Sequence, residues 1–199
     1  DTSVDPTDTK KPRFPGHIPG EVGIYIFILG DMLLYAWLFG SFMWYRKDDV
    51  ELFNASADTL HITFGMVNTL LLLTASLFVY WGIRAVRERI VPHLAPRFFL
   101  VAIACALGFL VNKYFEYSEL IADGHGPQDN TFYTFYFVLT GIHATHLLGG
   151  TAILVFLYKC SKRDEQSAND IRAMEGGASF WHVVDLLWII LFALLFLVR

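Results

Sequence analysis

Five long stretches of the chain are almost wholly apolar, and shorter polar connections separate them. Each stretch matches or exceeds the roughly 20 residues that a helix needs to cross a bilayer. The pattern therefore predicts five membrane-spanning helices, near residues 22–45, 60–83, 97–121, 132–158 and 178–198. The expected connections are residues 46–59, 84–96, 122–131 and 159–177.

The first twenty residues differ from the rest of the chain, because they are polar and contain four of its seven prolines. They predict a flexible N-terminal arm, followed by a single five-helix domain over residues 21–199.

Composition agrees with an all-α polytopic membrane protein. The chain is 55% hydrophobic and only 17% charged, against about 25% charged residues in typical soluble domains. A net charge of -4 argues against nucleic acid as a partner. Cys105 and Cys160 lie within or at the end of apolar stretches without metal-ligand spacing, and are interpreted as small buried apolar groups.

Lysine and arginine are divided unevenly between the two sides that five alternating spans would create. The arm, the second connection and the fourth connection fall on one side, with eleven basic residues at or beside them: Lys10, Lys11, Arg13, Arg84, Arg87, Arg89, Arg97, Lys159, Lys162, Arg163 and Arg172. The other side has only Arg46, Lys47 and Arg199. The positive-inside rule then places the N-terminus in the cytoplasm and the C-terminus outside.

Ionisable residues occur at membrane depth in four of the spans, where such groups are rare and point to function. They are Asp31 in the first span, Lys113 and Glu116 in the third, His143 and His146 in the fourth, and His182 and Asp185 in the fifth. Lys113 and Glu116 are three residues apart on one helix, so we expect them to pair. His182 and Asp185 have the same spacing, within Trp181-His182-Val183-Val184-Asp185-Leu186-Leu187-Trp188.

Three uses of these groups are open. His143 and His146 share a helix face and, with Glu116 or Asp185, could ligate a metal, but two histidines are weak evidence for a metal site. Alternatively, Asp31, Glu116, His143, His146, His182 and Asp185 could handle protons. Hydrogen bonding between helices is the commonest use of such residues and is our main interpretation. We expect Asn68, Gly141, Gly149, Gly150, Trp181 and Trp188 to serve helix packing, and no residue stands out as catalytic.

From residue 19 to the C-terminus the chain resembles subunit III of the haem-copper respiratory oxidases, in the short form with five spans. The similarity lies in Phe180 to Trp188, in the segment from Thr140 to Gly150 with its two histidines, in Glu116-Tyr117, and in Asn68-Thr69.

The resemblance implies a non-catalytic subunit of an oxidoreductase complex in the inner (plasma) membrane, without a redox centre or metal of its own. Its partners would be catalytic subunit I and subunit II, and the catalytic partner would carry haem and copper or non-haem iron. Such subunits stabilise subunit I and assist its proton uptake, and bound phospholipid is typical. Asp31 falls where long-form members have an intramembrane Glu, and the shorter acid keeps the charge type but moves it.

Two branches of this family have five spans. One serves quinol oxidases, and the other comprises accessory proteins encoded beside nitric oxide reductases. The opening segment from Pro19 to Met32 resembles the second branch. A stand-alone transporter is a further alternative, but the repeats and broken helices typical of transporters are missing from the sequence.

Overall fold

The computed structural model describes residues 22–89, 92–163 and 166–198, and the predicted N-terminal arm over residues 1–20 lies outside these ranges. The described chain is helical, with five helices long and apolar enough to cross a membrane. These are α1 (Val22–Asp48), α3 (Ile62–Glu88), α4 (Ala95–Ala122), α5 (Thr131–Ser161) and α6 (Ala168–Phe192), the last continuing through a π-helical stretch, η2 (Ala193–Leu197). The predicted five-span membrane fold is confirmed.

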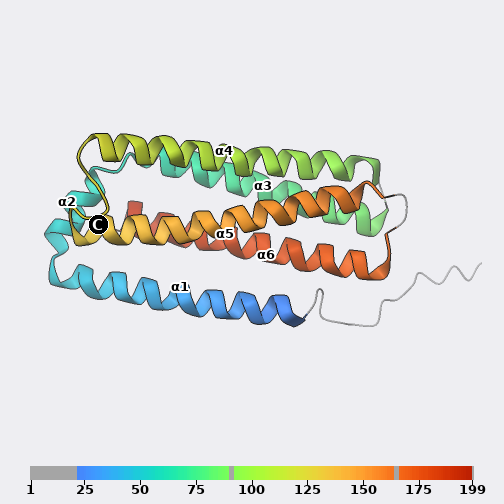
Figure 1. Cartoon of the computed structure of the whole chain (residues 1–199), viewed down its shortest axis with the longest axis horizontal. Coiled ribbons are helices and arrows are strands. Elements are labelled where there is room, and N and C mark those ends of the chain that lie inside the picture. Colours follow the sequence, from blue (N-terminus) through green and yellow to red (C-terminus); the bar gives the residue numbers. More distant parts are fainter. Residues whose placement is uncertain (1–21, 90–91, 164–165, 199) are drawn as a thin grey trace, which may run out of the picture.

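Four of these helices form a closed bundle. α4 packs between α3 and α5, and α6 also packs on α3 and α5, so each helix has two neighbours in the ring. α1 lies outside this ring, along one side of it, and packs mainly on α5 and α6 (Figure 1). The start of α1 and the end of the described chain lie at opposite ends of the bundle, as an odd number of spans requires (Figure 1).

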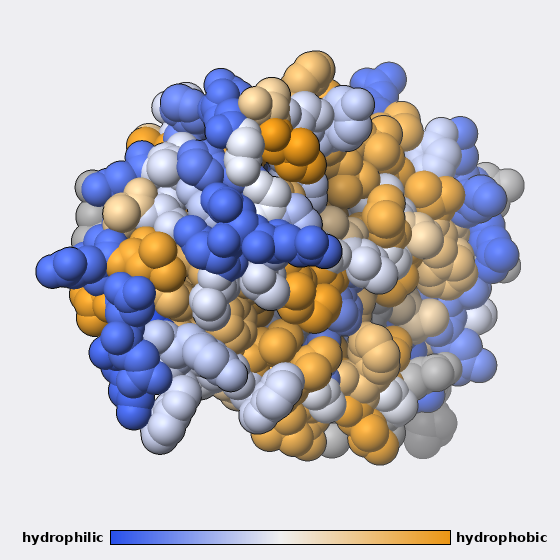
Figure 2. All heavy atoms as spheres, turned by 60° about the vertical axis from the view of Figure 1, so that its left-hand side comes forward, coloured by the Kyte–Doolittle hydropathy of each residue, from blue (hydrophilic) through white to orange (hydrophobic). Residues whose placement is uncertain are grey.

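The distribution of polar and apolar residues on the surface also agrees with a bundle that spans a membrane. Figure 2, which brings the α2 end forward, shows hydrophilic residues at the near and far ends and apolar residues between them. Along the spanning helices, large apolar side chains such as Leu33, Leu70 and Phe115 are more than half exposed. Exposure of this kind is stable in lipid, where the surroundings are as apolar as the side chains.

The predicted first connection, residues 46–59, contains a further helix, α2 (Val50–Asp58). Its start is capped by Asp49, whose side chain accepts a hydrogen bond of 3.1 Å from the backbone N–H of Leu52. Phe53 and Ala57 of this helix are buried. Residues 46–59 thus connect two spans as predicted, but the helix within them was not predicted, because the helix signal there is a cap and a short amphipathic turn rather than a long apolar run.

The last helix begins at Ala168, ten residues before the predicted start of the fifth span. Ser167 and Asp170 form a capping box, in which each side chain accepts a hydrogen bond from the other's backbone N–H. Such a cap stabilises a helix start by about 1 kcal/mol. The predicted boundary was wrong because hydropathy marks the apolar core of the membrane, whereas the helix extends beyond it into the polar layer.

Candidate functional site: polar groups inside the bundle

The first buried polar pair joins α1 to α5. Nε2 of His146 lies 2.9 Å from Oδ1 of Asp31, and Nδ1 of His146 lies 2.8 Å from the carbonyl oxygen of Ile142. A carbonyl oxygen only accepts, so Nδ1 carries a hydrogen. One further proton must then lie between Nε2 and Asp31, either as a carboxylic acid facing a neutral imidazole or as a carboxylate facing an imidazolium.

This pair has unused hydrogen-bonding capacity around it. Oδ2 of Asp31 and the hydroxyl of Tyr35 are both buried and have no hydrogen-bond partner among the described residues. The Tyr35 ring lies edge-on to His146, with 5.9 Å between ring centroids. The site therefore holds one shared proton and two oxygens that could bond a water molecule or another proton carrier.

A second cluster lies between α4 and α5. Nζ of Lys113 donates to Oε2 of Glu116 at 2.9 Å and to the hydroxyl of Tyr136 at 3.0 Å. The same hydroxyl donates to Oε1 of Glu116 at 2.5 Å, which closes a ring of three hydrogen bonds. The expected pairing of Lys113 with Glu116 is confirmed. Tyr136 was missed, because a tyrosine in an apolar span has no sequence signal that separates it from ordinary core aromatics.

His143 lies in the centre of the ring of four helices. It is fully buried between Phe109 of α4 and Trp188 of α6, and neither ring nitrogen has a hydrogen-bond partner among the described residues. His146, three residues later, faces α1 instead. Within the described ranges, no group of three His, Cys, Asp or Glu side chains converges as metal ligands would, so the alternative site from these histidines with Glu116 or Asp185 is not assembled.

His182 and Asp185 have different surroundings despite sharing a face of α6. Asp185 is buried, and its Oδ1 has no partner in the described part of the chain. His182 is exposed, and its Nδ1 lies 2.9 Å from the hydroxyl of Ser76 on α3. The partner that the structure gives His182 is thus on a neighbouring helix.

Other polar contacts hold α3 against its neighbours. Asn68 is fully buried and accepts a hydrogen bond of 2.8 Å from Asn112 of α4. The indole N–H of Trp188 donates to the hydroxyl of Thr69 at 3.1 Å. Both hydrogen bonds join two helices. An interhelical hydrogen bond in a membrane stabilises the helix contact by roughly 1 kcal/mol.

The predicted packing glycines are placed differently from one another. A Cβ added at Gly150 would lie 3.0 Å from the buried Trp181 ring, so α5 and α6 approach closely at this point. At Gly141 and Gly149 an added Cβ would meet nothing within 4 Å. At these two positions the described chain therefore shows no close helix approach of the kind predicted for them.

Comparison with known proteins adds to this geometry. The sequence model of the family described as cytochrome c oxidase subunit III matches residues 18–198. The cytochrome c oxidase subunit 3 of Corynebacterium diphtheriae is 29% identical over 182 residues, which cover 90% of this chain and 88% of the relative. The cytochrome bo(3) ubiquinol oxidase subunit 3 of Buchnera aphidicola is 26% identical over 88% of this chain and 84% of the relative.

A third relative is longer. The heme-copper oxidase subunit I+III of Aeropyrum pernix is 27% identical over 187 residues, which cover 88% of this chain but 22% of that protein. The matching region is therefore one part of a larger polypeptide in that organism.

Proposed function

Because the chain belongs to the cytochrome c oxidase subunit III family, we propose that it binds its catalytic partner through the face of α3 and α6 that carries Ser76 and His182. The chain is a subunit III of a terminal oxidase and a multi-pass protein of the membrane. Proteins of this family generally have no redox centre of their own. In the proposal, haem and metal belong to subunit I, and this chain stabilises that subunit.

The observation that carries the proposal is the exposure of His182 at membrane depth. His182 lies fourteen residues after the start of α6 but only four residues after the start of the apolar stretch at residue 178, which places it about 6 Å inside the apolar part of the helix. Its Nε2 forms no hydrogen bond within the described chain, although Nδ1 is held by Ser76. An unpaired polar atom facing lipid is costly, so a partner helix that offers a hydrogen-bonding group would be favoured there.

The surroundings of His182 suit a helix partner. Leu73 and Leu77 of α3 and Leu186 of α6 are each between 45% and 48% exposed. Leu73 and Leu186 lie three and four residues from Ser76 and His182, so they share a helix face with that pair. A polar pair on such a face can hydrogen-bond a partner helix within the membrane. The fused subunit I+III relative also carries both subunits on one polypeptide, which supports close contact between them.

The proposal predicts that replacing His182 weakens assembly. Interhelical hydrogen bonds in membranes contribute roughly 0.6–2 kcal/mol, so we expect His182→Leu to lower the affinity for the catalytic subunit about threefold to thirtyfold. The measurement is the ratio of this chain to haem in oxidase purified in mild detergent across a dilution series.

Thr145→Val is the matched control for that experiment. Thr145 is an exposed intramembrane hydroxyl on α5, and it bonds its own backbone at Gly141. Its loss should leave the ratio unchanged. Undiminished retention of the His182→Leu chain would contradict the proposed docking face.

A second role, assistance to proton uptake, is supported by the Asp31–His146 pair. Two bases there share one proton, and the buried Oδ2 of Asp31 beside them has no hydrogen-bond partner within the described part of the chain. We expect Asp31→Asn to keep the chain in the complex but to slow oxygen consumption most at alkaline pH, where protons from bulk water are scarcest. A pH–rate profile identical to that of the unmodified complex would reduce the pair to a packing contact.

The alternative role beside a nitric oxide reductase stays a prediction. Deleting the gene and comparing the loss of oxygen consumption with the loss of nitric oxide consumption separates the two roles. We expect oxygen consumption to fall and nitric oxide consumption to stay unchanged.

A further inference from the structure

A small pocket at the α2 end of the bundle reaches one of the buried polar clusters. It has a volume of about 10 Å³ and lies between the start of α3, with the turn before it, and the last two turns of α4. Its lining consists of Thr59, Leu60, His61, Phe64, Glu116, Glu119, Leu120 and Asp123. Glu116 is only 4% exposed and belongs to the closed ring with Lys113 and Tyr136. The pocket therefore lies between the surface and an otherwise enclosed carboxylate.

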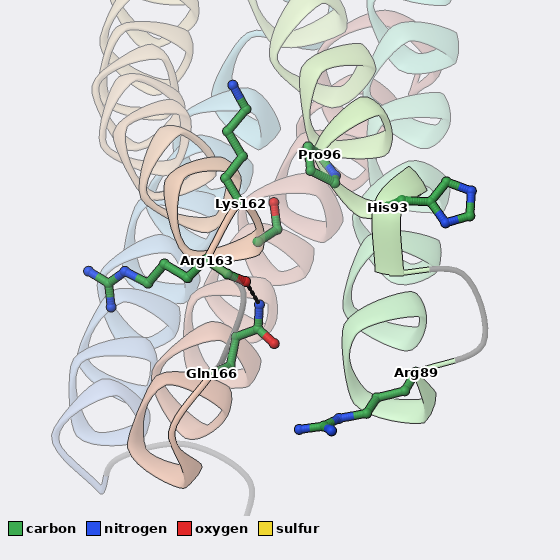
Figure 3. A pocket seen from close by; sticks show the side chains of 7 residues that line it. Arg89, His93, Pro96, Lys162, Arg163 and Gln166 are labelled. Atoms are coloured by element: carbon green, nitrogen blue, oxygen red, sulfur yellow. Dashed lines mark hydrogen bonds between the residues drawn. The ribbon is translucent and has the colours of Figure 1, made fainter.

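A larger pocket at the opposite end has no such connection. Its volume is about 430 Å³, and it lies between the end of α3, the start of α4 and the turn from α5 to α6 (Figure 3). In that view Gln166 bonds the backbone of Arg163, and the ring of His93 points away from the space. None of the described side chains that line it belongs to the hydrogen-bonded clusters inside the bundle. Of these two pockets, the small one reaches a buried ionisable group.

Glu116 keeps the capacity to accept a further hydrogen bond. Its Oε2 accepts from Lys113 at 2.9 Å, and its Oε1 accepts from the hydroxyl of Tyr136 at 2.5 Å. A carboxylate offers about four lone-pair positions, so these bonds do not saturate it. The other side chains around Lys113, from α4, α5 and α6 with η2, carry rings: Tyr117, His143, Trp188 and Phe196. The pocket is therefore the side from which a small donor such as water can reach Glu116.

The mouth of the pocket carries a titratable pair that is open to water. Nε2 of His61 lies 3.6 Å from Oε1 of Glu119, and the two side chains are 62% and 48% exposed. Glu119 follows Glu116 by three residues on α4, and Asp123 follows by four more, so the three carboxylates share one face of the helix. A proton that moves between the surface and the ring therefore meets exchangeable groups at successive depths.

The size and lining of the pocket favour water as its ligand. A buried water molecule needs roughly 10–15 Å³, about one water-sized sphere, and about two to four polar partners. The pocket has that volume, and Thr59, His61 and Glu116 are polar groups on its wall. Among the described residues, no three His, Cys, Asp or Glu side chains are arranged to hold a metal ion. We propose that the pocket holds a water molecule bonded to Glu116, through which the buried ring exchanges protons with the α2 side of the membrane.

This exchange route is separate from the Asp31–His146 pair. Asp31 lies nine residues after the start of α1, whereas Glu116 lies six residues before the end of α4, so the two clusters are nearer opposite ends of the bundle (Figure 1). During exchange one proton enters the ring for each proton that leaves it, so the charge of the ring is unchanged. The route also does not depend on the proposed docking face, because α3 and α4 alone form the pocket wall with the turn before α3.

The test measures hydrogen exchange of the Tyr136 hydroxyl in the purified full chain, in detergent micelles transferred to D₂O. Infrared spectroscopy follows the phenol band that Tyr136→Phe removes. The filling variant is Leu120→Phe, because Leu120 lines the pocket, and the matched control is Leu107→Phe at a half-exposed position of the same helix. We expect exchange to be at least about tenfold slower in the filling variant than in the control, since a filled pocket leaves only rarer local opening of the bundle.

A second variant keeps the test decisive if the larger side chain disturbs folding. Leu120→Ala widens the pocket, so we expect exchange at least about threefold faster than in Leu107→Ala, with unchanged exchange of the α4 backbone amides. The proposal is overturned if the Tyr136 hydroxyl of the unmodified chain exchanges as slowly as the core amides. Equal hydroxyl rates in the variants at residues 120 and 107, or amide exchange that accelerates together with the hydroxyl, would overturn it as well.

Discussion

At the scale of single residues, the two buried ion pairs of the described chain form either within one helix, as Lys113 with Glu116, or with one neighbouring helix, as Asp31 with His146. Lys113 and Glu116 were predictable as a pair, because three residues along one helix fix their separation. The partnership of Asp31 with His146 was not predictable, since it depends on how α1 and α5 are rotated about their axes. The same holds for Ser76 and His182, which lie 106 residues apart in sequence.

The closed ring of Lys113, Glu116 and Tyr136 predicts strong coupling between its charges. Removing one partner of a buried ion pair leaves an uncompensated charge and destabilises by about 3–5 kcal/mol. We therefore expect Lys113→Met to lower the free energy of unfolding by about that amount, and Lys113→Met with Glu116→Gln to lower it by less. Unfolding by denaturing detergent in mixed micelles measures both. Losses that simply add would show that the ring is not a coupled unit.

At the scale of elements, hydropathy located the five spans but not their ends or the short helix between two of them. Apolar length reports the membrane core, whereas α2 and the start of α6 are set by Asp49, Ser167 and Asp170 through their caps. Hydropathy also could not show which glycines lie where two helices approach closely. Gly82 lies against Phe99 and Gly149 against nothing, although both stand in apolar helices.

These two glycines give a matched test of packing between α3 and α4. A Cβ at Gly82 would lie 2.7 Å from the fully buried ring of Phe99, so Gly82→Leu must displace that ring. We expect it to destabilise by about 1–3 kcal/mol. Gly149→Leu places its side chain in open space and should be neutral or mildly stabilising, because leucine favours helix over glycine by roughly 1 kcal/mol. Equal effects of the two changes on unfolding would contradict the packing seen here.

At the scale of the whole molecule, the ends of the bundle differ in charge. The described end that holds the α3–α4 and α5–α6 connections carries Arg84, Arg87, Arg89, Lys162 and Arg163, while the end with α2 carries Arg46 and Lys47. The sequence predicts that the first of these ends faces the cytoplasm.

Single cysteines can test that orientation in cells. On a background without Cys105 and Cys160, we expect Ser167→Cys to be protected from a membrane-impermeant thiol reagent and Asp123→Cys to react with it. Both positions are exposed at helix ends. The reverse labelling pattern would invert the predicted topology.

The central claim is that this chain works as a subunit bound to a catalytic oxidase core. Its most direct test is to isolate the chain from its native membrane in mild detergent and to measure the haem and protein that accompany it. We expect a haem-containing catalytic subunit at equal stoichiometry and oxygen consumption that persists through many turnovers. Isolation of the chain without haem, beside an oxidase that lacks the chain and keeps full, lasting activity, would contradict the claim.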